Sequence, residues 1–175
     1  MMGIGLALAA GITPALAAGS PGDDMAAGSR ACYAYGGAAG SAVTRLLVEL
    51  HREQVNPGDE PVMWARVFAD KRGELHAGYN YDGCGAGETP GQLRCGFSCD
   101  AGAILIEASG NGLSVVPQGL ALRSCGSGIE TIGGFQLNPQ DVGGAAFLAP
   151  VEDAQCRDVM APLEKMLEDE EAAID

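Results

Sequence analysis

Short apolar runs separated by turn-forming residues make up the chain from residue 44 to residue 150. The clearest run, Val62–Ala69, carries its largest side chains on alternate positions, which is the pattern of a strand with one buried face. Asp70–Gly73 has the composition of a tight turn, and Glu74–Tyr81 then alternates between apolar and polar positions. These three segments predict a β-hairpin.

A second hairpin is predicted at Gly110-Asn111-Gly112, which lies between the apolar runs Ala103–Ser109 and Leu113–Val116. The remaining runs of strand length are Thr44–Leu50, Gln92–Phe97, Leu120–Ser124, Thr131–Leu137 and Ala145–Ala149. Parallel strands are usually connected by helices, and no segment of this region has a helical period over the length of such a helix. We therefore expect an all-β fold, either a single antiparallel β-sandwich or a small barrel of about eight or nine short strands.

The chain changes character after Pro150, where apolar residues recur at helical spacing within an acidic segment. Residues 150–175 contain nine acidic and two basic side chains, a net charge of −7. This pattern predicts a short amphipathic α-helix from about residue 161 to residue 173. We interpret residues 151–175 as an acidic C-terminal helix and tail, of which the end is expected to be a solvated face.

The first residues have the features of an export signal. No charged side chain precedes Asp23, and the apolar run Gly3–Ile12 is too short for a membrane span, which needs about 20 residues. Ala15-Leu16-Ala17 places small residues where signal peptidase requires them. The prediction is a signal peptide at 1–17, a flexible linker at 18–31, and a β domain at 32–150, with no membrane span after signal cleavage.

Composition and charge exclude several classes of protein. Apolar residues are 47% of the chain, which is too many for a disordered protein. The net charge is −13, and the two lysines and eight arginines are scattered along the sequence. Nucleic-acid binding is not expected, because contacts to phosphates need clustered basic side chains.

The even number of cysteines fits an oxidising compartment, where small domains form disulfide bonds. The six are Cys32, Cys84, Cys95, Cys99, Cys125 and Cys156. Sequence does not choose among the fifteen possible pairings. We expect Cys32 to pair with Cys156 and join the two ends, and the other four to pair between neighbouring strands, in a periplasmic or secreted protein.

Two metal sites are weaker alternatives to this interpretation. The spacing of Cys84, Cys95, Cys99 and Cys125 lacks the paired cysteines of structural zinc sites. Oxygen ligands occur at Asn80, Asp82 and Glu88 around a glycine-rich turn, but their spacing differs from that of an EF-hand calcium loop. No cofactor is predicted.

Catalytic motifs are missing from the sequence. The two histidines are His51, which we expect to end a strand in a charged loop, and His76, expected on the exposed face of its strand. A hydrolase would need one of them beside a nucleophile such as Ser98 or Ser127, and no motif supports that arrangement.

Tyrosines are the remaining candidates for binding, because they combine an apolar ring with a polar tip. They are Tyr33, Tyr35, Tyr79 and Tyr81. Taken together, the sequence predicts an exported, non-catalytic binding protein, such as an inhibitor, an envelope accessory protein or a ligand carrier. Its partner would be another protein or a small ligand; a metal-binding protein and a hydrolase are the alternatives.

Overall fold

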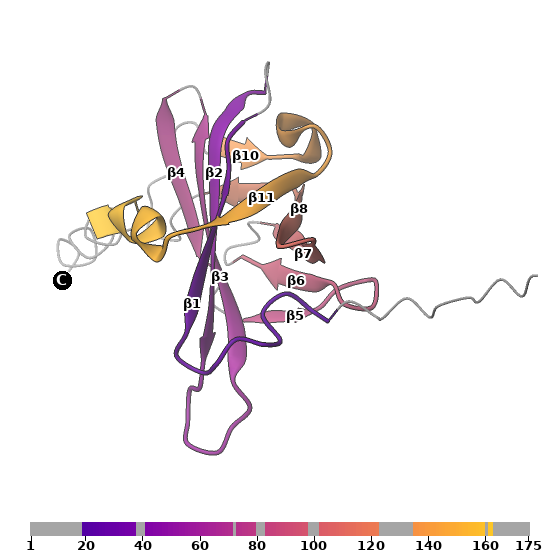
Figure 1. Ribbon diagram of the computed structural model, residues 1–175. Coiled ribbons are helices and arrows are strands. Elements are labelled where there is room, and N and C mark those ends of the chain that lie inside the picture. Colours follow the sequence, from indigo (N-terminus) through magenta and orange to yellow (C-terminus); the bar gives the residue numbers. More distant parts are fainter. Residues whose placement is uncertain are drawn as a thin grey trace, which may run out of the picture.

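The computed structural model is an all-β fold with a short C-terminal helix, as the sequence predicted (Figure 1). It describes residues 19–37, 41–71, 73–79, 83–97, 102–122, 135–159 and 161–162. The strands are β1 (Arg30–Tyr35), β2 (Val43–Glu53), β3 (Val62–Lys71), β4 (Glu74–Tyr79), β5 (Cys84–Ala86), β6 (Leu93–Gly96), β7 (Ala103–Ser109), β8 (Gly112–Gln118), β9 (Leu120–Leu122), β10 (Phe135–Leu137) and β11 (Ala146–Val151). A 3₁₀ helix, η1 (Pro139–Val142), precedes β11.

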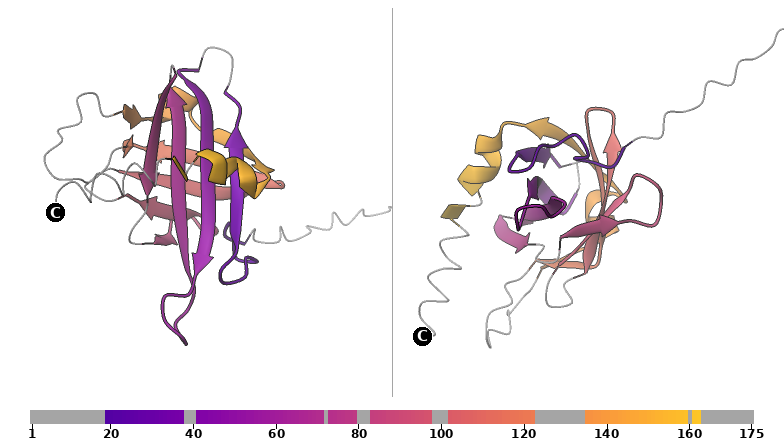
Figure 2. Two further views of the ribbon diagram at one scale, coloured as in Figure 1. Left: turned by 90° about the vertical axis from the view of Figure 1, so that its left-hand side faces the viewer. Right: turned by 90° about the horizontal axis from the view of Figure 1, so that it is seen from below.

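Nine strands form one antiparallel sheet in the order β4-β3-β2-β1-β11-β8-β7-β6-β5, and β9 pairs with β10 beside it. The last strand, β11, lies between β1 and β8 and so joins the two halves of the sheet. Strands β1–β4 run along the long axis of the molecule, and β5 and β6 cross them at a steep angle (Figure 1). Seen from below, the sheet curls around its core (Figure 2), and the edge strand β5 contacts β3, which leaves the sheet close to a barrel.

Strand β2 is apolar on both faces because both faces are covered. Val48 and Leu50 point into the core, where they pack with side chains from β7 and β8. On the outer face, Leu47 packs with Phe68 of β3 and with the Cys32–Cys156 disulfide, which attaches the C-terminal helix to β1. Figure 2 shows this helix crossing the outside of β1 and β2.

Both hairpins predicted from the sequence are confirmed. Strands β7 and β8 pair from Ser109 opposite Gly112, and Gly110 adopts a left-handed φ of 61°, which the two-residue turn between them requires. In the β3–β4 turn, the backbone N–H of Gly73 donates to Asp70 Oδ1 at 2.9 Å. Five more strands overlap the predicted runs, namely β2, β6, β9, β10 and β11. Residues 131–134 of the run Thr131–Leu137 are outside the described part of the chain.

Residues 20–29, for which the sequence suggested a linker, form turns that are attached to β2. The Arg52 guanidinium donates through Nη1 to the carbonyl oxygens of Asp23 at 2.8 Å and Met25 at 3.1 Å. The backbone of Arg52 also accepts from Gly28 and donates to Ser29. Met25 packs against the core, so this segment covers one end of the curled sheet.

Three elements differ from the sequence prediction. Strands β1 and β5 were not expected. β5 consists of small residues with weak β propensity, and both strands are held by pairing with neighbouring strands and by a disulfide. The C-terminal helix begins at residue 153, not near residue 161. Its early start places Cys156 over β1, and residues 163–175 of the expected helix are not described. Within the described residues, no helix is long and apolar enough to cross a membrane.

We predict that the two observed disulfides contribute unequally to stability. Cys32 and Cys156 are 124 residues apart, and the chain-entropy estimate for such a bridge is about 5 kcal/mol. Cys84 and Cys95 are 11 residues apart, for which the estimate is about 3 kcal/mol. Urea denaturation of the two double Cys→Ala variants should therefore give the larger loss for the 32/156 pair. An equal loss, or a larger loss for the 84/95 pair, would contradict this order.

Candidate functional site

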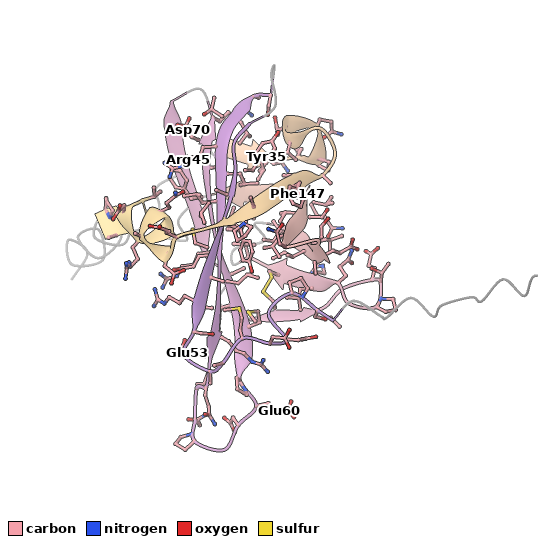
Figure 3. All side chains as sticks on the ribbon, viewed as in Figure 1. Tyr35, Arg45, Glu53, Glu60, Asp70 and Phe147 are labelled. Carbon is pink, nitrogen blue, oxygen red and sulfur yellow. A yellow bond between two sulfur atoms is a disulfide. The ribbon has the colours of Figure 1, made fainter. Side chains whose placement is uncertain are left out.

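Beyond the part of the sheet that the helix covers, the outer face becomes polar. Glu49 and His51 follow Leu47 on the outward side of β2, and antiparallel pairing places Arg66 opposite Glu49 and Trp64 opposite His51 on β3. Arg30 of β1 is paired with His51 on the other side. We call Arg30, Glu49, His51, Trp64 and Arg66 the outer-face cluster. Glu53, labelled in Figure 3, marks the end of β2 below it.

Glu49 is the buried centre of the outer-face cluster. Its side chain is only 3% exposed, although it carries a carboxylate. Arg30 Nη1 lies 3.6 Å from Oε1, and Arg66 Nη1 lies 3.5 Å from Oε2. Two positive charges from neighbouring strands therefore compensate the buried negative charge.

His51 stacks on Trp64 with ring centroids 6.2 Å apart and an angle of 11° between the ring planes. Burial lowers the pKa of the His51 imidazole below its ordinary value of 6.5, and the charges of Arg66 and Arg30 lower it further, against a smaller opposing effect of Glu53. Nε2 lies 3.7 Å from Glu53 Oε2. We therefore assign the proton of the neutral ring to Nε2, which leaves Nδ1 as an acceptor.

Among the described residues, three buried polar atoms of this cluster have no hydrogen-bond partner, although one of them is in the ion pair with Arg66. They are Glu49 Oε2, His51 Nδ1 and Trp64 Nε1. Buried polar atoms are nearly always bonded, and each one left without a partner costs about 1–3 kcal/mol. Their occurrence on adjacent positions of two paired strands indicates a place where water or a ligand completes the bonding.

In a second polar network, which includes Glu107 of β7, the polar groups are hydrogen-bonded to one another. Gln92 is 8% exposed; its Nε2 donates to Glu107 at 2.8 Å and its Oε1 accepts from the backbone N–H of Glu88 at 2.8 Å. Thr89 also donates to Glu107, at 3.2 Å. Because its bonds are made within the protein, this network holds the loop between β5 and β6, to which Glu88 contributes its backbone N–H.

The structure separates the tyrosines that the sequence grouped as binding candidates. Tyr33 and Tyr35 lie on β1 and pack against the core cluster, and burial raises the pKa of the Tyr33 phenol. Tyr79 pairs with Arg66 in the β3–β4 ladder, next to the outer-face cluster. Tyr81 is outside the described ranges.

The cysteines confirm part of the disulfide prediction. Cys32 is bonded to Cys156, as expected, and Cys84 is bonded to Cys95 across the neighbouring strands β5 and β6. A metal site made of Cys84, Cys95, Cys99 and Cys125 is therefore wrong, because two of its four sulfurs are in a disulfide and are not thiolate ligands. Cys99 and Cys125 belong to segments that the structure does not describe.

The other predicted residues do not assemble into a site among the described side chains. Asn80 and Asp82 of the proposed calcium loop, and Ser98 and Ser127 of the proposed hydrolase, fall in undescribed segments. His76 lies on β4, opposite Ala69. No group of three His, Cys, Asp or Glu side chains suited to a metal ion occurs in the described ranges. His51 does not end its strand in a loop as expected, since β2 continues to Glu53.

Sequence reasoning missed Arg30, Glu49, Trp64 and Arg66 as site residues. One signal was available. Glu49 is the single polar residue in the segment Leu46-Leu47-Val48-Glu49-Leu50, and the other four residues are all apolar. A carboxylate in a strand that is buried on both faces requires a basic partner on a neighbouring strand. That partner, Arg66, is the one charged residue within the apolar run Val62–Ala69.

We predict that His51 makes the stability of the protein depend on pH. Its pKa is lower in the folded than in the unfolded protein, so the unfolded protein binds the proton first as the pH falls below 6.5. The contribution of neutral His51 is therefore complete above 6.5 and is lost as the pH falls to the folded pKa. His51→Asn, compared with wild type by urea denaturation between about pH 7.5 and about pH 5, should lose less stability than wild type does. A difference between the two proteins that stays constant with pH would contradict the prediction.

No family model, no curated protein and no solved structure matches this chain.

Proposed function

We propose that the protein is an exported, disulfide-stabilised binding protein without a catalytic role, and that it binds its partner through the outer-face cluster. The observation that supports this proposal is the set of three buried atoms without a described hydrogen bond, Glu49 Oε2, His51 Nδ1 and Trp64 Nε1, on one face of β2 and β3. Trp and Arg are also the residues most enriched among those that dominate binding energy at interfaces.

The chemistry of His51 favours binding over catalysis. A general base for a nucleophile must hold that nucleophile within hydrogen-bond reach. His51 instead stacks on Trp64 and faces Glu53. Its lowered pKa keeps it neutral at pH 7, a state in which it can exchange hydrogen bonds with a polar ligand.

Two observations support export to the periplasm or secretion. The Cys32–Cys156 and Cys84–Cys95 disulfides form and persist in oxidising compartments. The apolar run and the small residues at 15–17 of the sequence have the features of a signal peptide.

We predict that the exported protein begins at Ala18 or Gly19 and contains no free thiol. The intact mass of the denatured protein should correspond to cleavage after Ala17 or Ala18, and iodoacetamide should react only after reduction. A non-reducing peptide map should contain the two observed bridges and a third between Cys99 and Cys125, the pair that remains from six cysteines. Thiols that react without reduction, or a retained leader, would contradict the export proposal.

The binding proposal predicts that one NMR signal responds to the partner. Trp64 is the only tryptophan, so its indole N–H gives a single signal in a ¹⁵N spectrum. Adding concentrated extract of the periplasm or culture medium should shift or broaden that signal. Arg30→Ala should weaken the response, while Arg94→Ala, which removes an exposed arginine from β6, should not.

A response confined to residues far from the cluster would contradict the proposal. Phe147 is one such distant residue. It is exposed on β11 and lies far from Glu53, the end of β2 next to the cluster (Figure 3).

A further inference from the structure

We infer that the ligand of the outer-face cluster is a saccharide, whose hydroxyl groups complete the bonding of Glu49, His51 and Trp64. This inference rests on the proposed function, because it names the ligand class of the same site. It follows from three properties of the cluster: its unmet hydrogen-bonding capacity, its charge balance and its aromatic rings.

The unmet capacity consists of two acceptors and one donor. Among the described residues, Glu49 Oε2 and His51 Nδ1 accept no hydrogen bond and Trp64 Nε1–H donates none, although Glu49 Oε2 keeps its ion pair with Arg66 at 3.5 Å. A simple anion satisfies only the donor, and a simple cation satisfies only the acceptors. A pair of neighbouring hydroxyl groups satisfies all three, because each hydroxyl donates once and accepts up to twice.

The described ion pairs on this face balance in charge, which favours an uncharged ligand. Arg30 and Arg66 are positive, whereas Glu49 and Glu53 are negative. Because His51 is neutral at pH 7, the ion pairs of Arg30, Arg66, Glu49 and Glu53 carry no net charge among the described residues.

The remaining hydrogen-bonding groups favour hydroxyls over an amide. A primary amide also offers two donors and an acceptor, but its nitrogen accepts no bond. Arg30 Nη1 is 3.6 Å from Glu49, longer than a hydrogen bond, so its guanidinium can turn toward further acceptors. Saccharides provide such acceptors in excess, since each hydroxyl oxygen has two lone pairs.

Access and packing are also compatible with a sugar ring. The three atoms are shielded from solvent, so a ligand must displace a neighbouring side chain to reach them. The side chain of Arg30 is 48% exposed, more than any other ion-paired side chain of the cluster. It is also long enough to move aside. The stacked rings of Trp64 and His51 then offer the apolar surface on which the C–H groups of a sugar can pack.

The test is a titration of the ¹⁵N-labelled chain with glucose, galactose, mannose and N-acetylglucosamine, each as the methyl β-glycoside. We expect at least one of them to shift the Trp64 indole signal saturably. Trp64→Phe keeps an aromatic ring but removes the N–H, so calorimetry should show binding weakened by about tenfold, the effect of one hydrogen bond. Phe147→Ala removes an aromatic ring that is 52% exposed on β11 and should leave the affinity unchanged.

The wild-type titration decides the question even if Trp64→Phe fails to fold. Silence of the indole signal with all four glycosides would overturn the saccharide assignment and leave only ordered water at these atoms. A shift with acetamide and none with the glycosides would overturn it in favour of an amide from a protein partner, and the proposed function would stand. If extract of the exported compartment also leaves the signal unmoved, the proposed function fails together with the assignment.

Discussion

Burial of β2 on both of its faces is the constraint on which the rest of the structure depends. The core supplies one cover, through side chains such as Ile104 and Leu148, and the C-terminal helix supplies the other. The helix can do this only because Cys156 is bonded to Cys32 on the neighbouring strand. The described turns of this helix, residues 153–159, would be marginal alone in water, so packing and this attachment stabilise them.

The outer-face cluster exists because that cover ends before the strand does. Leu47 is under the helix, whereas Glu49 and His51 continue the same face past it. Apolar residues at these positions would form an exposed hydrophobic patch. The charges are not fully solvated either, because the side chain of Glu49 is only 3% exposed. The sequence instead places a carboxylate between two arginines and a neutral imidazole against an indole. This combination removes solvent from polar atoms without satisfying all of them within the described residues, which leaves room for water or a ligand to complete the bonding.

Much of the fold could be predicted because its signals are local. The Asp70–Gly73 and Gly110–Gly112 turns depend on residues next to each other in sequence, and the alternation of β3 depends on one strand. β1 could not be found in this way, because it is fixed by pairing with β2 and with β11, the latter more than 100 residues away. The cluster is also non-local: Arg30, Glu49 and Arg66 come from three strands, and only the register brings them together. The Cys32–Cys156 pair was predictable because joining the ends of a small domain confers the largest entropic gain.

The order of the cysteines has a consequence for how the chain matures. If the protein is exported from its N-terminus, Cys32 reaches the oxidising compartment first, and Cys84 and Cys95 arrive before Cys156 does. Joining cysteines in order of arrival would give a bond between Cys32 and Cys84, which is not the bond in the folded protein. That early bond would have to be exchanged by thiol–disulfide attack, a step that takes on the order of minutes to hours without a catalyst. For an exported chain that joined its cysteines in that order, a disulfide isomerase would speed the formation of the native bonds.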